Sequence, residues 1–530
     1  MTMKFLFSFF FLPFYIFNYL NASEITEFPV LYEGRYRPAQ AYAELYEQNN
    51  SPSSSNSPLD MLWAKELSVA APESNQTVYN QVLRLEFQKI PPNRIAETLE
   101  HSFPLRERLK NAGDLFLVLP SSYNTDNWLP LNALNLQVYD PKTQMMEEVS
   151  NFTLYTTEQF NAIRAAYKEL QKAFSENNHP KMQIAKQNLA HSLHAAYRSI
   201  AGTEAQKANR KQTLYPTLLQ LKFERLYINY PWTSLLFFLY SLASIALLLS
   251  LVFSLRIYST ALFFLFFAFI IHTCVIAMRC FILERPPVTN IFETLLYVPW
   301  IATAAAIFFH FFKKSAPLLL AASMTSLCLL IIPEFTPQQQ NLDPLQAVLD
   351  SQFWLLVHVL LVVGSYGIFI LSALLAHMYL ISFLFNQRYS GNSMNAQMIL
   401  KTMYLGTTLL IAGTVLGGIW AAESWGRFWD WDPKESWAFI SSCIYLIWIH
   451  AYRFKIIGSF GLAVGAITGF LAISFTWYGV NYILGTGLHS YGFGTGGIEA
   501  YYMFLGCECL FVVTSLLKKL IKKDKITHHP

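Results

Sequence analysis

Long apolar runs fill the C-terminal part of the chain. From Trp232 onward, nine such runs follow one another, at about 232–255, 259–281, 292–312, 315–333, 352–385, 402–421, 437–452, 459–481 and 499–517. Each is close to the roughly 20 residues that an α-helix needs to cross the hydrocarbon core of a bilayer, and the fifth is long enough to project beyond it. The pattern predicts an all-α polytopic membrane protein with about nine transmembrane helices over residues 231–530.

The N-terminal part of the chain has a different pattern. Lys4 precedes an apolar stretch over residues 5–19, and the small residues Ala22 and Ser23 follow, so residues 1–23 are predicted to be a signal peptide or a retained anchor. Residues 24–230 are polar, and we expect an extracytoplasmic domain that is α-rich or α+β. Its stretch of serine, asparagine and proline at 49–58 is typical of a flexible loop.

Residues 156–200 are the part of this domain whose structure is easiest to predict. Their composition favours two helices, broken near His179-Pro180. Thr156 is followed three residues later by Gln159, which is the spacing of a capping box at the start of a helix.

Composition narrows the protein class further. Hydrophobic residues make up 53% of the 530 residues and charged residues only 14%, whereas a soluble domain carries about 25% charge. The net charge of +4 gives no basic surplus for binding nucleic acid. The six cysteines form no C-x-x-C pair, which argues against a disulfide framework, a thioredoxin-like motif and covalent attachment of heme to this chain. We expect these thiols to pack inertly.

Basic residues orient the predicted spans. If residues 24–230 lie outside, the loops on the inner side carry most of the lysine and arginine: Arg256, Lys313, Lys314, Arg388, Lys401, Arg453, Lys455, Lys518, Lys519, Lys522, Lys523 and Lys525. The short outer loops carry Arg279, Arg285, Arg427 and Lys434. This asymmetry follows the positive-inside rule and agrees with the signal-like N-terminus.

With this topology, the segment between the sixth and seventh spans faces outward and is rich in tryptophan. Five of the twelve tryptophans lie within residues 420–437, at Trp420, Trp425, Trp429, Trp431 and Trp437. One interpretation is an aromatic belt at the membrane interface. The other is a platform for a large flat ligand, with Arg427 or Lys434 pairing with ligand carboxylates.

Heme has these features, and its iron accepts histidine as an axial ligand. His358 lies near the outer start of the fifth span, with Trp354 four residues earlier on the same helical face. His489 lies between the eighth and ninth spans. A single histidine at such a place is usually a packed polar group, but two of them bracketing the tryptophan-rich segment favour ligation.

These residues resemble a known family. Segment 420–437, with Trp429-Asp430-Trp431-Asp432-Pro433, resembles the tryptophan-rich WWD signature of the heme-handling protein superfamily. Residues 488–492 and the Trp354–His358 segment resemble its CcsA (ResC) branch. That branch forms the system II cytochrome c synthase together with CcsB (ResB).

The resemblance implies a function. A CcsA-like domain at 231–530 would bind heme b, present it at the outer face of the bacterial cytoplasmic membrane and promote its thioether attachment to the C-x-x-C-H cysteines of apocytochrome c. His358 and His489 would be the outer axial ligands, around a WWD segment that includes Asp430 and Asp432. The chain would act by positioning heme, without a catalytic side chain of its own.

The resemblance also implies an inner heme site. His450 matches the family's intramembrane histidine, and a histidine of CcsB would complete its ligation. His272 and His310 are candidates for this second ligand within the chain, although a packed polar group is the simpler interpretation of both. Two other functions stay open: a heme exporter without ligase activity, and a respiratory membrane subunit with b-type heme.

Overall fold

The chain forms two compact units, Met1–Tyr230 and Pro231–Pro530. The computed structural model describes residues 29–32, 35–39, 42, 63, 117–120, 128–131, 134, 137–140, 145–148, 155–201, 217–253, 257–332, 352–385, 392–485 and 498–527. The signal-like segment 1–23, the low-complexity stretch 49–58 and His489 lie outside the described residues.

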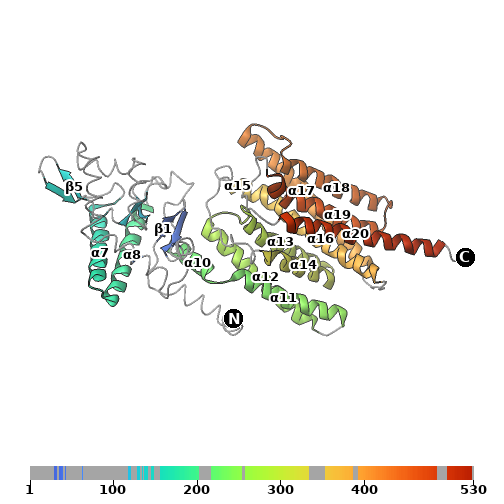
Figure 1. Ribbon diagram of the computed structural model, residues 1–530, viewed down its shortest axis with the longest axis horizontal. Helices are drawn as coiled ribbons and strands as arrows, with labels where there is room; N and C mark the ends of the chain where they lie inside the picture. Colours follow the sequence, from blue (N-terminus) through green and yellow to red (C-terminus); the bar gives the residue numbers. More distant parts are fainter. Residues whose placement is uncertain are drawn as a thin grey trace. The chain divides into compact units, whose positions relative to one another are not determined.

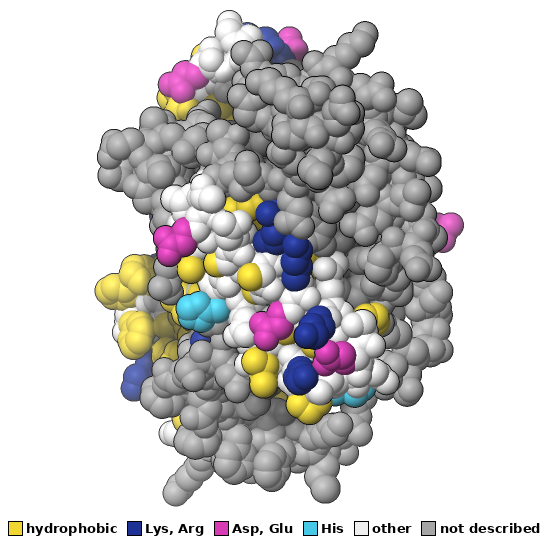
Figure 2. All heavy atoms as spheres, turned by 90° about the vertical axis from the view of Figure 1, so that its left-hand side faces the viewer, with side chains coloured by type: hydrophobic (Ala, Val, Ile, Leu, Met, Phe, Trp, Pro, Cys, Tyr) yellow, Lys and Arg dark blue, Asp and Glu magenta, His cyan; other side chains and the backbone are white. Residues whose placement is uncertain are grey.

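The first unit combines short antiparallel hairpins with helices. The described residues of this unit form three two-stranded sheets, which pair β1 (Pro29–Tyr32) with β2 (Arg35–Pro38), β3 (Leu117–Pro120) with β4 (Trp128–Pro130), and β5 (Gln137–Asp140) with β6 (Met145–Glu148). The helices are α7 (Thr157–Ser175), α8 (His179–Ala201) and α10 (Leu218–Asn229). Acidic and basic side chains lie next to one another on the face shown in Figure 2, as on an ordinary solvated surface.

The predicted helix pair is confirmed. The Thr156 hydroxyl accepts a hydrogen bond from the Gln159 backbone N–H, and the Gln159 side chain accepts one from the Thr156 N–H. This reciprocal cap satisfies two of the backbone donors that a helix start leaves unpaired. The break falls between α7 and α8, as expected from His179-Pro180.

The second unit is a helical bundle (Figure 1), so the predicted all-α membrane class is confirmed. The described residues of all nine apolar runs are mainly helical. Their elements are α11 (Trp232–Val252), α12 (Tyr258–Leu283), α13 (Ile291–Phe312), α14 (Ala316–Leu330), α15 (Gln352–Trp354), the π-helix η4 (Leu355–Val359), α16 (Leu360–Leu384), α17 (Asn392–Trp425), α18 (Pro433–Arg453), α19 (Ser459–Ser474), the π-helix η5 (Phe475–Leu484) and α20 (Ile498–Thr527).

Seven helices of the described chain are long and apolar enough to cross a membrane. The two runs that fall short of this measure do so for different reasons. Helix α14 has only 15 residues. Helix α18 has 21 residues, but polar side chains on several of its faces, among them Ser441, Ser442 and His450, make it less apolar than the other spans.

Helix α16 is the centre of the bundle. It packs against α13, α14, α17 and α19, and 72% of its apolar window is buried, compared with 17% for α20. The six cysteines are free, and four of them lie exposed on the helices rather than in the core.

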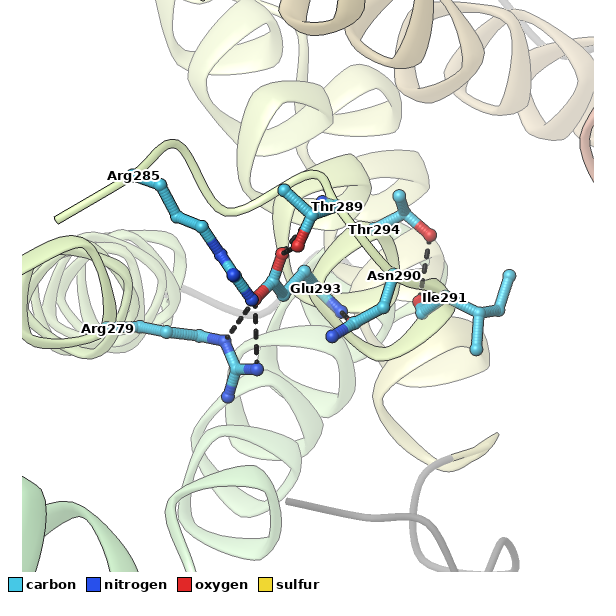
Figure 3. A network of polar contacts seen from close by, with 7 residues as sticks. All are labelled: Arg279, Arg285, Thr289, Asn290, Ile291, Glu293 and Thr294. Atoms are coloured by element: carbon cyan, nitrogen blue, oxygen red, sulfur yellow. Dashed lines mark hydrogen bonds and ion pairs between the residues drawn. The ribbon is translucent and has the colours of Figure 1, made fainter. Parts of the chain in front are cut away.

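A buried ionic network joins α12 to the start of α13 (Figure 3). One carboxylate oxygen of Glu293 accepts hydrogen bonds from Nε and Nη2 of Arg279, at 3.1 and 3.0 Å. The other accepts from the backbone N–H and hydroxyl of Thr289, at 2.7 and 2.6 Å, and Arg285 Nη2 lies 3.7 Å from the first oxygen. The side chains of Arg279 and Glu293 are 0% exposed. The Glu293 carboxylate therefore holds the end of α12 and the segment before α13 together.

Replacing the Glu293 carboxylate tests how much it contributes to the stability of the protein. Glu293→Gln is expected to lower the free energy of unfolding by about 3–5 kcal/mol, because two guanidinium groups then face a neutral amide inside the protein. Urea unfolding of the detergent-solubilised chain measures it. Asp430→Asn is the control: Asp430 also pairs with an arginine, but its side chain is 61% exposed, so the loss is expected to stay below about 1 kcal/mol. Equal losses in the two variants would contradict the organising role of Glu293.

Candidate functional site

The tryptophan-rich segment is mostly helical. Helix α17 continues through Trp425 and α18 begins at Pro433, so only residues 426–432 form a loop, and the expected loop over 420–437 is too long. Gly426 has a φ of +71°, the left-handed conformation that ends many helices. Trp420 and Trp425 therefore project from the last turns of α17, and Trp437 projects from α18.

Acidic side chains shape the loop. Asp432 caps α18: its side chain accepts from the Lys434 N–H at 2.9 Å. Glu435 accepts from the backbone N–H groups of Asp430 and Asp432 at 2.9 and 3.3 Å, which completes a capping box. Asp432 is thus a structural member of the segment. The importance of Glu435 was not predicted, although the spacing Asp-Pro-x-Glu is a helix-start signal.

The five tryptophans divide into separate contacts instead of forming one flat platform. Trp429 meets Trp431 edge-to-face at 5.8 Å between ring centroids, and Trp437 packs 4.3 Å from Phe475 of η5. The Arg427 guanidinium lies 5.7 Å from the centre of the Trp425 ring. Arg427 also forms an ion pair with Asp430. Trp431 is 69% exposed, so its ring is accessible at the surface of the described chain.

The Trp429 indole N–H is buried without a hydrogen-bond partner in the part of the chain that the structure describes. Lys434, the second residue of α18, is half-buried. Burial lowers the pKa of the Lys434 amine to about 8, and the nearby Asp432 carboxylate opposes that shift. Two donors, one neutral and one titratable, thus lie within the segment.

His358 lies in η4 and is fixed by α17. Its Nδ1 is 2.7 Å from the Gly413 carbonyl oxygen. Because a carbonyl only accepts, Nδ1 carries the proton, and the neutral ring has its lone pair on Nε2. The ring also lies 5.9 Å from that of Trp420. A donor hydrogen bond from the far nitrogen is how proteins orient a metal-binding imidazole.

Gly417 makes room for this ring. A Cβ added there would lie 2.5 Å from Cε1 and 2.8 Å from Nδ1 of His358. The α17 backbone is therefore in direct contact with the imidazole, and no other residue type fits without moving it.

Trp354 fastens the start of the same helix. Its indole N–H donates to Glu423 of α17 at 2.8 Å, and its side chain is buried. Gly413, Gly417, Trp420 and Glu423 follow one another at spacings of three and four residues along α17, so they share one face. That face holds both Trp354 and His358.

The remaining histidines lie in different surroundings. His450, in the last turn of α18, is exposed, and its Nδ1 donates to the Leu446 carbonyl at 2.7 Å. His272 is fully buried and meets the Tyr240 hydroxyl at 3.2 Å. His310 accepts from the Ser315 N–H through Nδ1, at 3.1 Å, and Nε2 lies 3.2 Å from the Tyr258 hydroxyl. None of these hydrogen bonds joins His272 or His310 to His450.

A substitution of Gly417 tests how strictly the ring is held. Gly417→Ala is expected to push the imidazole off the Gly413 carbonyl and to destabilise the protein by about 1–3 kcal/mol. Carbethoxylation of His358, followed by mass spectrometry, should then be faster than in the parent protein. Gly406→Ala is the matched control, because its Cβ would crowd Phe369 of α16 at 2.7 Å instead. The idea fails if both variants, or neither, change the reactivity of His358.

Comparison with known proteins identifies the family. The model of the family "Cytochrome C assembly protein" matches residues 288–489. The chain is 34% identical to the protein NrfI of Wolinella succinogenes over 243 residues, covering 43% of this chain and 25% of NrfI. It is 33% identical to the cytochrome c biogenesis protein CcsA of Chlamydomonas reinhardtii, covering 39% of this chain and 61% of that protein.

The chain thus matches less than two thirds of the length of both these relatives. It is also 32% identical to CcsA of Guillardia theta over 234 residues, which cover 39% of this chain and 76% of that protein. The matched region contains α13, α16, α17 and α18, together with the contacts of His358 and the tryptophan-rich segment. The protein therefore belongs to the CcsA family of cytochrome c biogenesis proteins.

Proposed function

We propose that this chain presents heme b at the outer face of the bacterial cytoplasmic membrane and promotes its thioether attachment to apocytochrome c. The observation that carries the proposal is the placement of His358. Its ring is oriented by the Gly413 carbonyl, bears its lone pair on Nε2 and lies beside Trp420. The resemblance of residues 488–492 to the family supports His489 as the second axial ligand.

Groups in the segment fit the rest of the porphyrin. The exposed Trp431 ring offers apolar contact to a flat macrocycle. The Trp429 N–H and the Lys434 amine are donors for the two propionates, and Arg427 already pairs with a carboxylate, Asp430. Holding the ring in place is the chain's catalytic contribution, since it orients the vinyl groups toward the thiols of the apocytochrome. Each thiol adds across a vinyl double bond, sulfur to one carbon and hydrogen to the other.

We propose His450 as the inner heme ligand. Its Nδ1–H donates to the Leu446 carbonyl, so its lone pair is also on Nε2, and its side chain is exposed on α18. Because the imidazole is exposed, another chain can supply the second axial ligand of the same heme iron. We propose a histidine of a CcsB-like membrane partner as that ligand. His272 is enclosed and bonded to Tyr240, so we propose that it packs rather than ligates.

The same contacts disfavour a respiratory subunit with b-type heme. Such a protein needs facing histidines inside the bundle, whereas His272, His310 and His377 of the described bundle interact with tyrosine or glutamate side chains. A heme exporter would need the same heme sites. Only the product distinguishes the two functions, because the exporter forms no thioether bond between heme and apocytochrome c.

Co-expression with a CcsB-like partner and a reporter apocytochrome tests the outer site. His358→Ala and His489→Ala are each expected to lose outer-site heme absorption and at least tenfold of the holocytochrome yield, because the iron loses an axial ligand. Added imidazole should restore part of both signals by replacing that ligand. Heme staining and absorption spectra measure the result.

A control variant and an inner-site variant complete this experiment. His191→Ala, which alters an exposed histidine of α8, is the control and should behave as the parent. His450→Ala should lower heme loading of both sites if heme enters through the inner one. Normal spectra and normal maturation in the His358 and His489 variants would refute the outer site. Normal heme loading without any thioether product would instead favour the exporter.

The lowered pKa of Lys434 predicts a pH dependence. A propionate favours the charged amine, so above pH 8 heme binding must take up a proton. Affinity should then fall by up to roughly tenfold per pH unit between pH 8 and 10. Heme titration of the purified protein measures this. Lys434→Arg stays charged over that range and should give a flat profile. Superimposable profiles would exclude Lys434 as a propionate partner.

A further inference from the structure

Each proposed outer heme ligand belongs to a chain segment with a π-helix. His358 lies within η4, and His489 follows the last residue of η5 by five positions in the chain. π-Helices are rare and occur frequently at functional sites. Two imidazoles can bind one iron only if the segments that carry them keep a fixed separation, because such groups must be held to within about 0.5 Å of the productive geometry. The contacts that hold η4 and η5 therefore bear on heme ligation.

The first turn of α13 holds η5. The indole N–H of Trp477 in η5 donates to the Thr294 hydroxyl at 3.2 Å. That hydroxyl donates in turn to the Ile291 carbonyl at 2.8 Å (Figure 3), so its orientation is fixed by its own helix. The Trp477 ring also lies beside that of Tyr366 of α16, with ring centroids 5.8 Å apart. Trp477 thus joins η5 to both α13 and α16.

The next turn of α13 holds the segment that contains His358. The Tyr297 hydroxyl donates to the carbonyl of Leu360 at 3.3 Å, and Leu360 is the first residue of α16, two positions after His358. The same hydroxyl lies against the backbone of α16, because a Cβ added to Gly364 would be 3.3 Å from it. Tyr297 is buried. It therefore fixes the start of α16 directly after η4.

The backbones of α13 and α16 are in direct contact just beyond these residues. A Cβ added to Gly367 would lie 2.5 Å from the Val298 carbonyl oxygen and 2.7 Å from the Ile301 side chain. Small residues allow such close approach between membrane helices. The start of α13 is held as well, because the buried Glu293 carboxylate accepts from Arg279 of α12. This end of α13 cannot move relative to α12 or α16 without breaking these contacts.

We propose that the first two turns of α13 are a spacer that sets the separation of the two segments carrying the outer heme ligands. Thr294 and Tyr297 are its positioning residues, three positions and about 4.5 Å apart along one face of the helix. Thr294 acts on η5 through Trp477, and Tyr297 acts on η4 through the start of α16. The inference rests on the proposed function, because it takes His358 and His489 as the ligands.

Carbon monoxide binding to the reduced protein, purified with heme after co-expression with a CcsB-like partner, tests the spacer. A ferrous iron with two histidine ligands binds carbon monoxide only after one histidine leaves, so the rate measures how firmly the ligands are held. The outer-site signal is the part of the spectrum that His358→Ala removes. Thr294→Val and Tyr297→Phe should each raise the rate by roughly two- to tenfold, the effect of losing one hydrogen bond. Added imidazole should slow it again by occupying the vacated position.

Two variants that remove comparable hydroxyls are the controls. Thr303→Val alters a buried hydroxyl of the same helix that is bonded to Ser326 of α14 at 3.3 Å. Tyr240→Phe alters a buried phenol that lies 3.2 Å from His272. These contacts involve neither π-helix, so both controls should bind carbon monoxide at the parent rate. Thermal unfolding of all four variants checks that they are folded and lose similar stability.

Combined variants separate the two contacts. Thr294→Val together with Tyr297→Phe loosens both ligand segments, so the two accelerations should multiply. Thr294→Val together with Trp477→Phe removes the same hydrogen bond from its two ends, so this pair should bind carbon monoxide no faster than Trp477→Phe alone.

Two outcomes would overturn the spacer and leave the outer site standing, provided that His358→Ala still loses its heme. The first is a parent rate of carbon monoxide binding in both Thr294→Val and Tyr297→Phe. The second is equal acceleration in the controls, because the effect would then come from a general loss of stability. Normal outer heme absorption in His358→Ala and His489→Ala would instead refute the proposed function, and the spacer with it.

Discussion

The candidate heme site depends on the close approach of α16 and its preceding π-helix to α17. The His358 ring lies against the backbone of α17, where Gly417 has no side chain to obstruct it and Gly413 offers its carbonyl oxygen. Small residues allow such approaches between membrane helices. The contact sets the position of the ring, the tautomer and the direction of the Nε2 lone pair. Trp354 and Glu423, one turn away, hold the same two helices together.

Two carboxylates within the bundle have cationic or imidazole partners. Glu293 collects donors from Arg279 and Thr289 in the interior, and His377 pairs with Glu508. Breaking such a group is far more costly inside a protein than at its surface. These groups therefore restrict how the helices pack, while apolar contact supplies most of the packing area.

Much of the architecture was readable from the chain. Each predicted apolar run contains a helix, although only seven helices of the described chain are long and apolar enough to span a membrane. Thr156 with Gln159 marked the start of α7. The boundaries near the tryptophans were less predictable, because α17 extends to Trp425 and α18 starts at Pro433. Aromatic and charged residues there interrupt the apolar pattern without interrupting the helix. The Asp432–Glu435 cap was an available signal for the true start of α18.

The sequence by itself determined the membrane class, the tryptophan-rich segment and the histidines that surround it. These follow from local composition and spacing, which need no knowledge of distant contacts. Only the tertiary structure decided which groups meet: His358 with Gly413 and Gly417, and His377 with Glu508, 131 residues apart. It also separated the exposed His450 from the enclosed His272. The physical reason is that helix packing brings together residues far apart in the chain, and side-chain size at each contact decides which of them touch.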